Sequence, residues 1–160
     1  MNAKKALKTL HTLGSVGMGG GIIAYMLMLT YGPEPALTEA FVGFREGIYS
    51  LTRFVIVPSM LLVLLSGLLA MAIHHPFQNA LWVWLKAAGG LLIFEAVLAS
   101  IDAPARRAAE GLRSALSAGT EPIAALNTIN DRWGALWVLL GLVAVNVVLA
   151  TWRPRFAGKK

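Results

Sequence analysis

The sequence contains no cysteine and few charged side chains. Without Cys in its 160 residues, the chain cannot form disulfides, thiolate metal sites or a covalent CxxCH haem attachment. It also has no P-loop, no GxGxxG motif and no internal repeat, which removes the usual sequence signals of nucleotide binding. Charged residues make up 14% of the chain and apolar residues 57%. This composition indicates a membrane protein, in which any cofactor is held by ligands other than thiolates.

Four long apolar runs account for this composition, and the mean hydropathy is +0.66. Each run has about the 20 residues that a helix needs to cross a bilayer. We therefore predict an all-α fold in which residues 1–160 form one integral membrane domain, a four-helix bundle in contact with lipid. The predicted spans are residues 9–31, 54–73, 80–101 and 133–152.

The formal net charge of +6 comes from Lys and Arg at the ends of these spans. They form no single stripe or patch, so the charge indicates membrane topology and does not indicate a nucleic-acid partner. Eight of the 14 cations fall on the side of the two termini and six on the other, which favours cytoplasmic N and C termini in a bacterial inner membrane. The eight are Lys4, Lys5, Lys8, Lys86, Arg153, Arg155, Lys159 and Lys160.

Two connecting segments also have helical patterns. In residues 38–53, Phe41, Phe44 and Ile48 recur at helical spacing, so this amphipathic segment either lies on the outer surface or prolongs the second span. Residues 105–118 place charged side chains at helical spacing and predict a helical extension between the third and fourth spans.

Four nitrogen-bearing side chains are predicted to share one layer near the inner end of the spans. Counting about 1.5 Å per residue from the inner end of each span places His11, His74, His75 and Lys86 at similar depth. Two imidazoles from facing helices can ligate the iron of a b-type haem without a covalent link. The alternatives are an interfacial turn for the two adjacent histidines and a lysine that reaches the headgroups.

Glycines next to this layer allow two interpretations. Gly14 follows His11 by three residues and Gly89 follows Lys86 by three, so both lie on the face of their predicted ligand and leave room for a macrocycle. Gly17 and Gly21 form a GxxxG pattern, which is typical of close helix packing and would also suit a homodimer.

Glu95 is the one acidic residue expected near the middle of the bilayer. It lies nine residues beyond Lys86, about 13 Å deeper. We expect it to face the bundle interior, either hydrogen-bonded to Tyr25 or Asn146 or as part of a proton path.

Several short motifs in this order resemble a known group of membrane proteins. They are KALKTLHTLG at residues 5–14, RFVIVP at 53–58, WVWLK at 82–86 and WRPRF at 152–156. Together they are similar to the copper-resistance-D-like membrane proteins and to a related family of predicted four-helix integral membrane proteins.

The same motifs are more distantly similar to the bacterial haem-binding protoporphyrinogen oxidase family. That resemblance implies that His11 is a haem ligand and that Lys86 is functionally required. Arg53, which opens the second span in the same pattern, is a further functional candidate. The chain departs from that family after Gly14 and has a long insertion between the third and fourth spans, so the resemblance implies the fold and the haem site and leaves enzymatic activity open.

The leading hypothesis is an inner-membrane protein that binds haem b. His11 would be one axial ligand, and His74, His75 or Lys86 the other. Its role would be electron transfer or porphyrin-related redox chemistry, and no catalytic residue is assigned. One alternative is a cofactor-free accessory subunit of a larger membrane complex. Another is a small transporter, either for copper through its six methionines or proton-coupled through Glu95.

Overall fold

The computed structural model describes residues 3–73, 81–120 and 133–152. These ranges are helical apart from short connections and contain no strand, so the all-α prediction is confirmed for them. His74 and His75 lie outside the described residues.

Helix α1 (Ala3–Tyr31) opens the bundle. It begins six residues before the predicted span and ends where Gly32 and Pro33 follow. Proline lacks a backbone donor and disfavours the helical conformation in the residue before it, so a helix ends readily at this point. The chain then turns back, and Thr38 caps the next helix because its hydroxyl accepts a hydrogen bond from the Phe41 N–H at 3.2 Å.

The next helix runs without a break from Glu39 to Ile73. It consists of α2 (Glu39–Leu51), a π-helical turn η1 (Thr52–Ile56) and α3 (Val57–Ile73). The amphipathic segment therefore prolongs the second span.

The third long helix repeats this arrangement. It consists of α5 (Leu81–Val97), the π-helical turn η2 (Leu98–Asp102) and α6 (Ala103–Ala118). The predicted helical extension is thus continuous with the third span. Helix α8 (Trp133–Trp152) has the predicted bounds of the fourth.

Each π-helical turn ends two residues before a proline, Pro58 or Pro104. A proline inside a helix removes one backbone donor and clashes with the carbonyl four residues earlier. In the turns ahead of these prolines, the Val57 N–H donates to the Thr52 carbonyl and the Ala103 N–H to the Leu98 carbonyl, five residues back. The wider turns let both helices continue through a proline.

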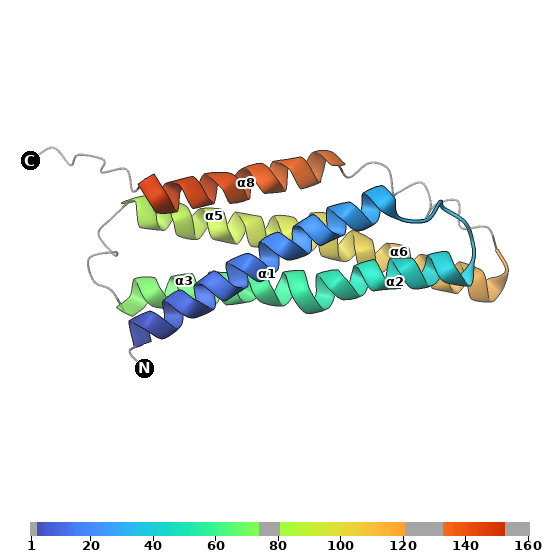
Figure 1. Ribbon diagram of the computed structural model, residues 1–160, viewed down its shortest axis with the longest axis horizontal. Coiled ribbons are helices and arrows are strands. Elements are labelled where there is room, and N and C mark those ends of the chain that lie inside the picture. Colours follow the sequence, from blue (N-terminus) through green and yellow to red (C-terminus); the bar gives the residue numbers. More distant parts are fainter. Residues whose placement is uncertain (1–2, 74–80, 121–132, 153–160) are drawn as a thin grey trace, which may run out of the picture.

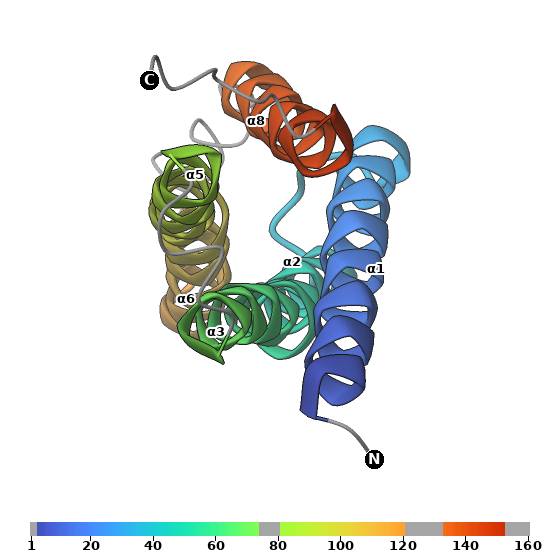
Figure 2. The same ribbon diagram turned by 90° about the vertical axis from the view of Figure 1, so that its left-hand side faces the viewer.

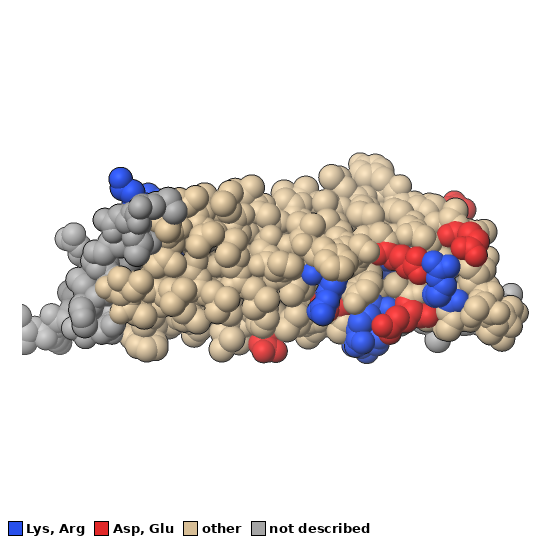
Figure 3. Space-filling model, turned by 90° about the horizontal axis from the view of Figure 1, so that it is seen from below, with Lys and Arg blue, Asp and Glu red and all other residues tan. Residues whose placement is uncertain are grey.

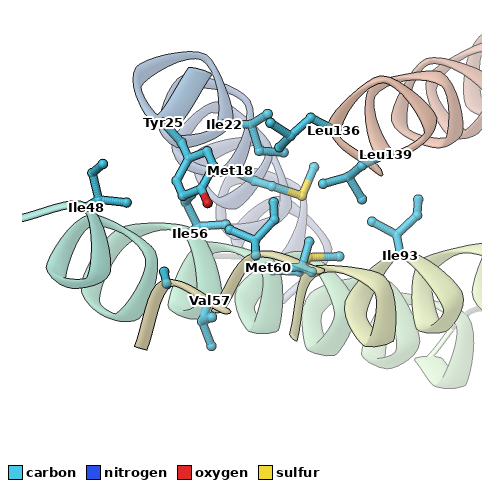
Figure 4. Close-up of a cluster of buried hydrophobic side chains, with 13 residues drawn as sticks. Met18, Ile22, Tyr25, Ile48, Ile56, Val57, Met60, Ile93, Leu136 and Leu139 are labelled. Carbon is cyan, nitrogen blue, oxygen red and sulfur yellow. The ribbon is translucent and has the colours of Figure 1, made fainter. Parts of the chain in front are cut away.

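Four helical columns lie around a common centre in the end-on view of Figure 2, and the largest cluster of buried apolar side chains packs between them. Helix α1 packs on α3, α3 on α5 and α5 on α8, while α2 pairs with α6 and η1 with η2. The first turn of α1 and the last turn of α8 lie at the same end of the molecule (Figure 1). The core draws side chains from all four columns, among them those labelled in Figure 4: Met18, Ile22, Tyr25, Ile48, Ile56, Val57, Met60, Ile93, Leu136 and Leu139.

A group of acidic and basic side chains lies toward the opposite end (Figure 3), where α2 and α6 extend past the other helices (Figure 1). Arg113 on α6 donates two hydrogen bonds, of 2.7 and 2.6 Å, to the carboxylate of Glu46 on α2. Its guanidinium also lies 3.6 Å from Glu39. These contacts join the two helices across their exposed side.

Arg45 is buried between these helices, with 4% of its surface exposed, together with Phe41, Val42 and Ile48 of α2. The packing of α6 on α2 buries a wider stripe of α2 than the spacing of Phe41 and Phe44 predicted.

Three helices are long and apolar enough to cross a membrane: Lys5–Tyr31, Glu39–Ile73 and Val83–Ala118. Within the described part of α8, the apolar stretch Leu136–Val148 is shorter than these three. In the most apolar part of each of the three long helices, 28%, 28% and 17% is buried inside the protein.

Candidate functional site

His11 is anchored to helix α3 by one ring nitrogen. The half-buried imidazole projects from α1, and its Nδ1 lies 3.0 Å from the Val63 carbonyl oxygen and 3.1 Å from the Ser66 hydroxyl. Ser66 is itself buried. Both α3 partners fall within one helical turn, so the ring is held between two adjacent helices at the end of the bundle where α1 begins.

These contacts decide where the proton of a neutral imidazole sits. The Val63 carbonyl can only accept, so Nδ1 must donate to it. Ser66 gives its own hydroxyl proton to the Leu62 carbonyl at 2.6 Å, which leaves the Ser66 oxygen free to accept from Nδ1 as well. The other nitrogen, Nε2, then carries a lone pair and can accept a hydrogen bond or ligate a metal. This is the arrangement of a histidine prepared to ligate a metal.

Lys86 lies near His11, as the sequence predicted. It is half-buried in the second turn of α5, and its charge is close enough to act on the imidazole. His11 and Lys86 therefore lie toward the same end of the bundle, the end that holds the first turn of α1. His74 and His75, the other two members of the predicted layer, fall between α3 and α5, outside the described residues.

The room expected beside Gly14 is filled by helix α3. A Cβ at this buried glycine would lie 2.7 Å from the Ser59 carbonyl oxygen and 2.9 Å from a Val63 methyl group. Gly17 faces the Ser59 side chain in the same way, and Gly21 faces Ile56. The prediction that Gly14 leaves space for a macrocycle is wrong, because the glycine face of α1 is used for close packing on α3.

Gly89 is also in contact with a neighbouring helix. A Cβ there would lie 3.2 Å from the amide nitrogen of Asn146 on α8. Space at Gly89 is therefore already shared with a polar side chain. Next to the imidazole itself stands Gly67, where a Cβ would lie 3.6 Å from the His11 Cε1 atom. The glycine that borders His11 is thus on α3. It lies 56 residues after His11 in the sequence, so local spacing gave no reason to select it.

Glu95 does not face the bundle interior, and this prediction is corrected. Its side chain is exposed, whereas Ile93 and Val97 on the same helix are buried in the core. Glu95 is two residues from each, about 200° around the helix, so the packing of α5 turns it outward. Its expected partner Tyr25 is buried with 1% exposure.

Arg53 lies on η1 and is exposed, away from the His11 layer. Within the described ranges, no cluster of three or more His, Asp or Glu side chains could hold a metal ion on its own. A metal at His11 would therefore arrive within a larger ligand or draw ligands from other residue types.

No family model, curated protein or solved structure matches this chain. We therefore infer the function from the site itself.

Proposed function

We propose that this chain is a multi-pass protein of the bacterial inner membrane that binds one b-type haem through His11. The observation that carries the proposal is the pair of hydrogen bonds from the His11 Nδ1 to Val63 and Ser66. They orient the ring and direct the lone pair of Nε2 away from α3, as second partners do for histidines that ligate metals.

The residues fit an axially ligated haem in part. His11 supplies a neutral imidazole ligand, and Lys86 supplies either a second ligand or a cation for a propionate. Because α3 fills the space at Gly14, the porphyrin belongs on the side of the ring that carries Nε2. His74 and His75 stay alternative second ligands.

A haem held in this way supplies one-electron redox chemistry. His11 and Lys86 would hold it, the contacts of the His11 ring with Val63 and Ser66 would fix the imidazole, and the surrounding apolar helices would exclude water. We therefore infer a role in electron transfer or in porphyrin-related redox chemistry.

The test is the haem content of His11→Ala compared with Thr12→Ala, purified from cells with ample haem. Thr12 is exposed and bonds only to its own helix, through the Lys8 carbonyl, so it serves as a matched neighbour. We expect wild type and Thr12→Ala to carry stoichiometric haem and His11→Ala to lose it while keeping its helical content. Equal haem in both variants would contradict the assignment of His11.

A further inference from the structure

Helix α5 carries Glu95 on an otherwise apolar outward face. Exposed positions on this face recur at helical spacing, and Leu91 and Leu92 expose 53% and 64% of their surface. Ala88 of α5 and Ala99 of the adjoining turn η2 are exposed on either side of them. The face is Ala88, Leu91, Leu92, Glu95 and Ala99, and we refer to it as the Glu95 face.

The contacts between helices place Glu95 near the middle of the bundle. A Cβ at Gly90 would lie 3.6 Å from a Leu64 methyl group, so α5 and the antiparallel α3 are level at that point. Five residues further along α5, Glu95 is level with about Ser59 of α3. Ser59 in turn contacts Gly17, the midpoint of α1. Glu95 therefore lies at mid-depth in the apolar zone.

A carboxyl group turned toward lipid at this depth is costly, and such groups usually pair within a protein interior. The partner must present a hydrogen-bonding group at the same depth. Two copies of one chain inserted in the same direction meet this condition, because a two-fold axis along the membrane normal brings each residue opposite its own copy. Facing carboxyl groups that hold at least one proton between them both donate and accept hydrogen bonds.

We propose that the Glu95 face is the interface of a parallel homodimer in which two Glu95 side chains hydrogen-bond to each other. The small side chains of Ala88 and Ala99 let the two α5 helices approach closely around this contact. The GxxxG pattern of α1, the sequence signal for a dimer, is already buried against α3. The proposal is independent of haem binding.

Disulfide cross-linking in native membranes tests this interface, since the chain has no cysteine of its own. Leu92→Cys reports on the Glu95 face. Val16→Cys is the matched control, because Val16 is 68% exposed and adjoins the midpoint of α1. At low expression, we expect oxidation to give a cross-linked dimer with Leu92→Cys at several times the yield of Val16→Cys. Equal yields, or links to other proteins alone, would overturn the proposal.

Two substitutions then test the carboxyl pair itself in the Leu92→Cys background. Glu95→Leu removes the hydrogen bonds and should reduce the dimer yield several-fold. Glu95→Gln keeps a donor and an acceptor and should retain most of it. Because Glu95 is exposed, neither change disturbs the core, and helical content and elution volume verify folding. An undiminished yield with Glu95→Leu would show that the carboxyl does not hold the dimer.

Discussion

Ser66 and Val63 determine which nitrogen of His11 is open to a ligand. Replacing Ser66 with Ala leaves the Val63 carbonyl as the only described acceptor for Nδ1, so the ring is less firmly oriented. Loss of a second partner of a ligating histidine typically weakens metal affinity about 10- to 100-fold. We expect a haem titration of Ser66→Ala to show a loss in this range.

The control is Ser15→Ala. The Ser15 hydroxyl donates to the His11 backbone carbonyl at 2.8 Å and does not bond to the ring. Haem affinity should therefore stay at the wild-type value. If Ser15→Ala and Ser66→Ala lost affinity equally, the effect would come from general loosening of α1 and α3.

Gly14 is expected to be intolerant of a side chain because its neighbour is backbone. A Cβ 2.7 Å from the Ser59 carbonyl oxygen requires α1 and α3 to move apart, and overpacking of this kind costs about 1–3 kcal/mol. Gly14→Ala should lower the thermal stability of the detergent-solubilised protein. Gly20→Ala, where a Cβ meets nothing within 4 Å, should leave it unchanged or raise it. The opposite order would contradict the close packing of α1 on α3.

At the residue scale, the sequence was informative where depth alone mattered. Counting along the spans placed His11 and Lys86 in one layer. The predictions of free space beside Gly14 and of an inward-facing Glu95 were wrong. The direction in which a helical residue points depends on which neighbour the helix packs against, and counting along a span does not give it. The low contrast between the faces of α5, apolar nearly all round, gave no signal that Ile93 and Val97 would turn inward.

At the element scale, the paired π-helical turns are the feature that sequence patterns did not predict. Pro104 follows the predicted third span, and the structure shows one continuous helix through it, from Leu81 to Ala118. The π-helical turn η2 is tolerated because η1 packs against it. A contact between segments so far apart in the chain cannot be predicted from a local sequence pattern. The helical extension itself was predictable from the charge spacing of residues 105–118.

The α2–α6 pair should respond to pH through Glu46, which lies before the apolar part of its helix. The hydrogen bond from Arg113 lowers the pKa of the Glu46 carboxyl, with the Arg113 charge acting in the same direction and burial opposing it. A lowered pKa in the folded state means that the pair stabilises the fold above the usual Glu range. This contribution is lost as the pH falls through the lowered pKa.

We therefore expect Glu46→Gln to melt slightly below wild type at about pH 7, and the difference to shrink as the pH falls below the usual Glu range. Glu110→Gln is the control, since Glu110 pairs only with Arg106 on its own exposed helix face, at 3.8 Å. Its melting temperature should track wild type throughout. A Glu46→Gln deficit that persists in acid would mean that the Arg113 pair is not its cause.

At the scale of the whole molecule, four helical columns return the chain to the end where it starts, so both termini should face the same side. Because Lys and Arg are more numerous on the side of the termini, we expect the termini in the cytoplasm. Green fluorescent protein fused after Lys160 should therefore fluoresce. Alkaline phosphatase inserted after Thr120 should be active, because helix α6 ends at the opposite end of the bundle. Active phosphatase at the C-terminus would reverse the proposed orientation.

The central claim is that this four-helix protein holds haem through His11, and an absorption spectrum tests it most directly. The purified protein should show a Soret band when oxidised and sharp α and β bands after reduction with dithionite, as a low-spin b-type haem does. His11→Ala should lose these bands. A colourless wild-type protein from cells with ample haem would contradict the account and leave the helical bundle without its proposed cofactor.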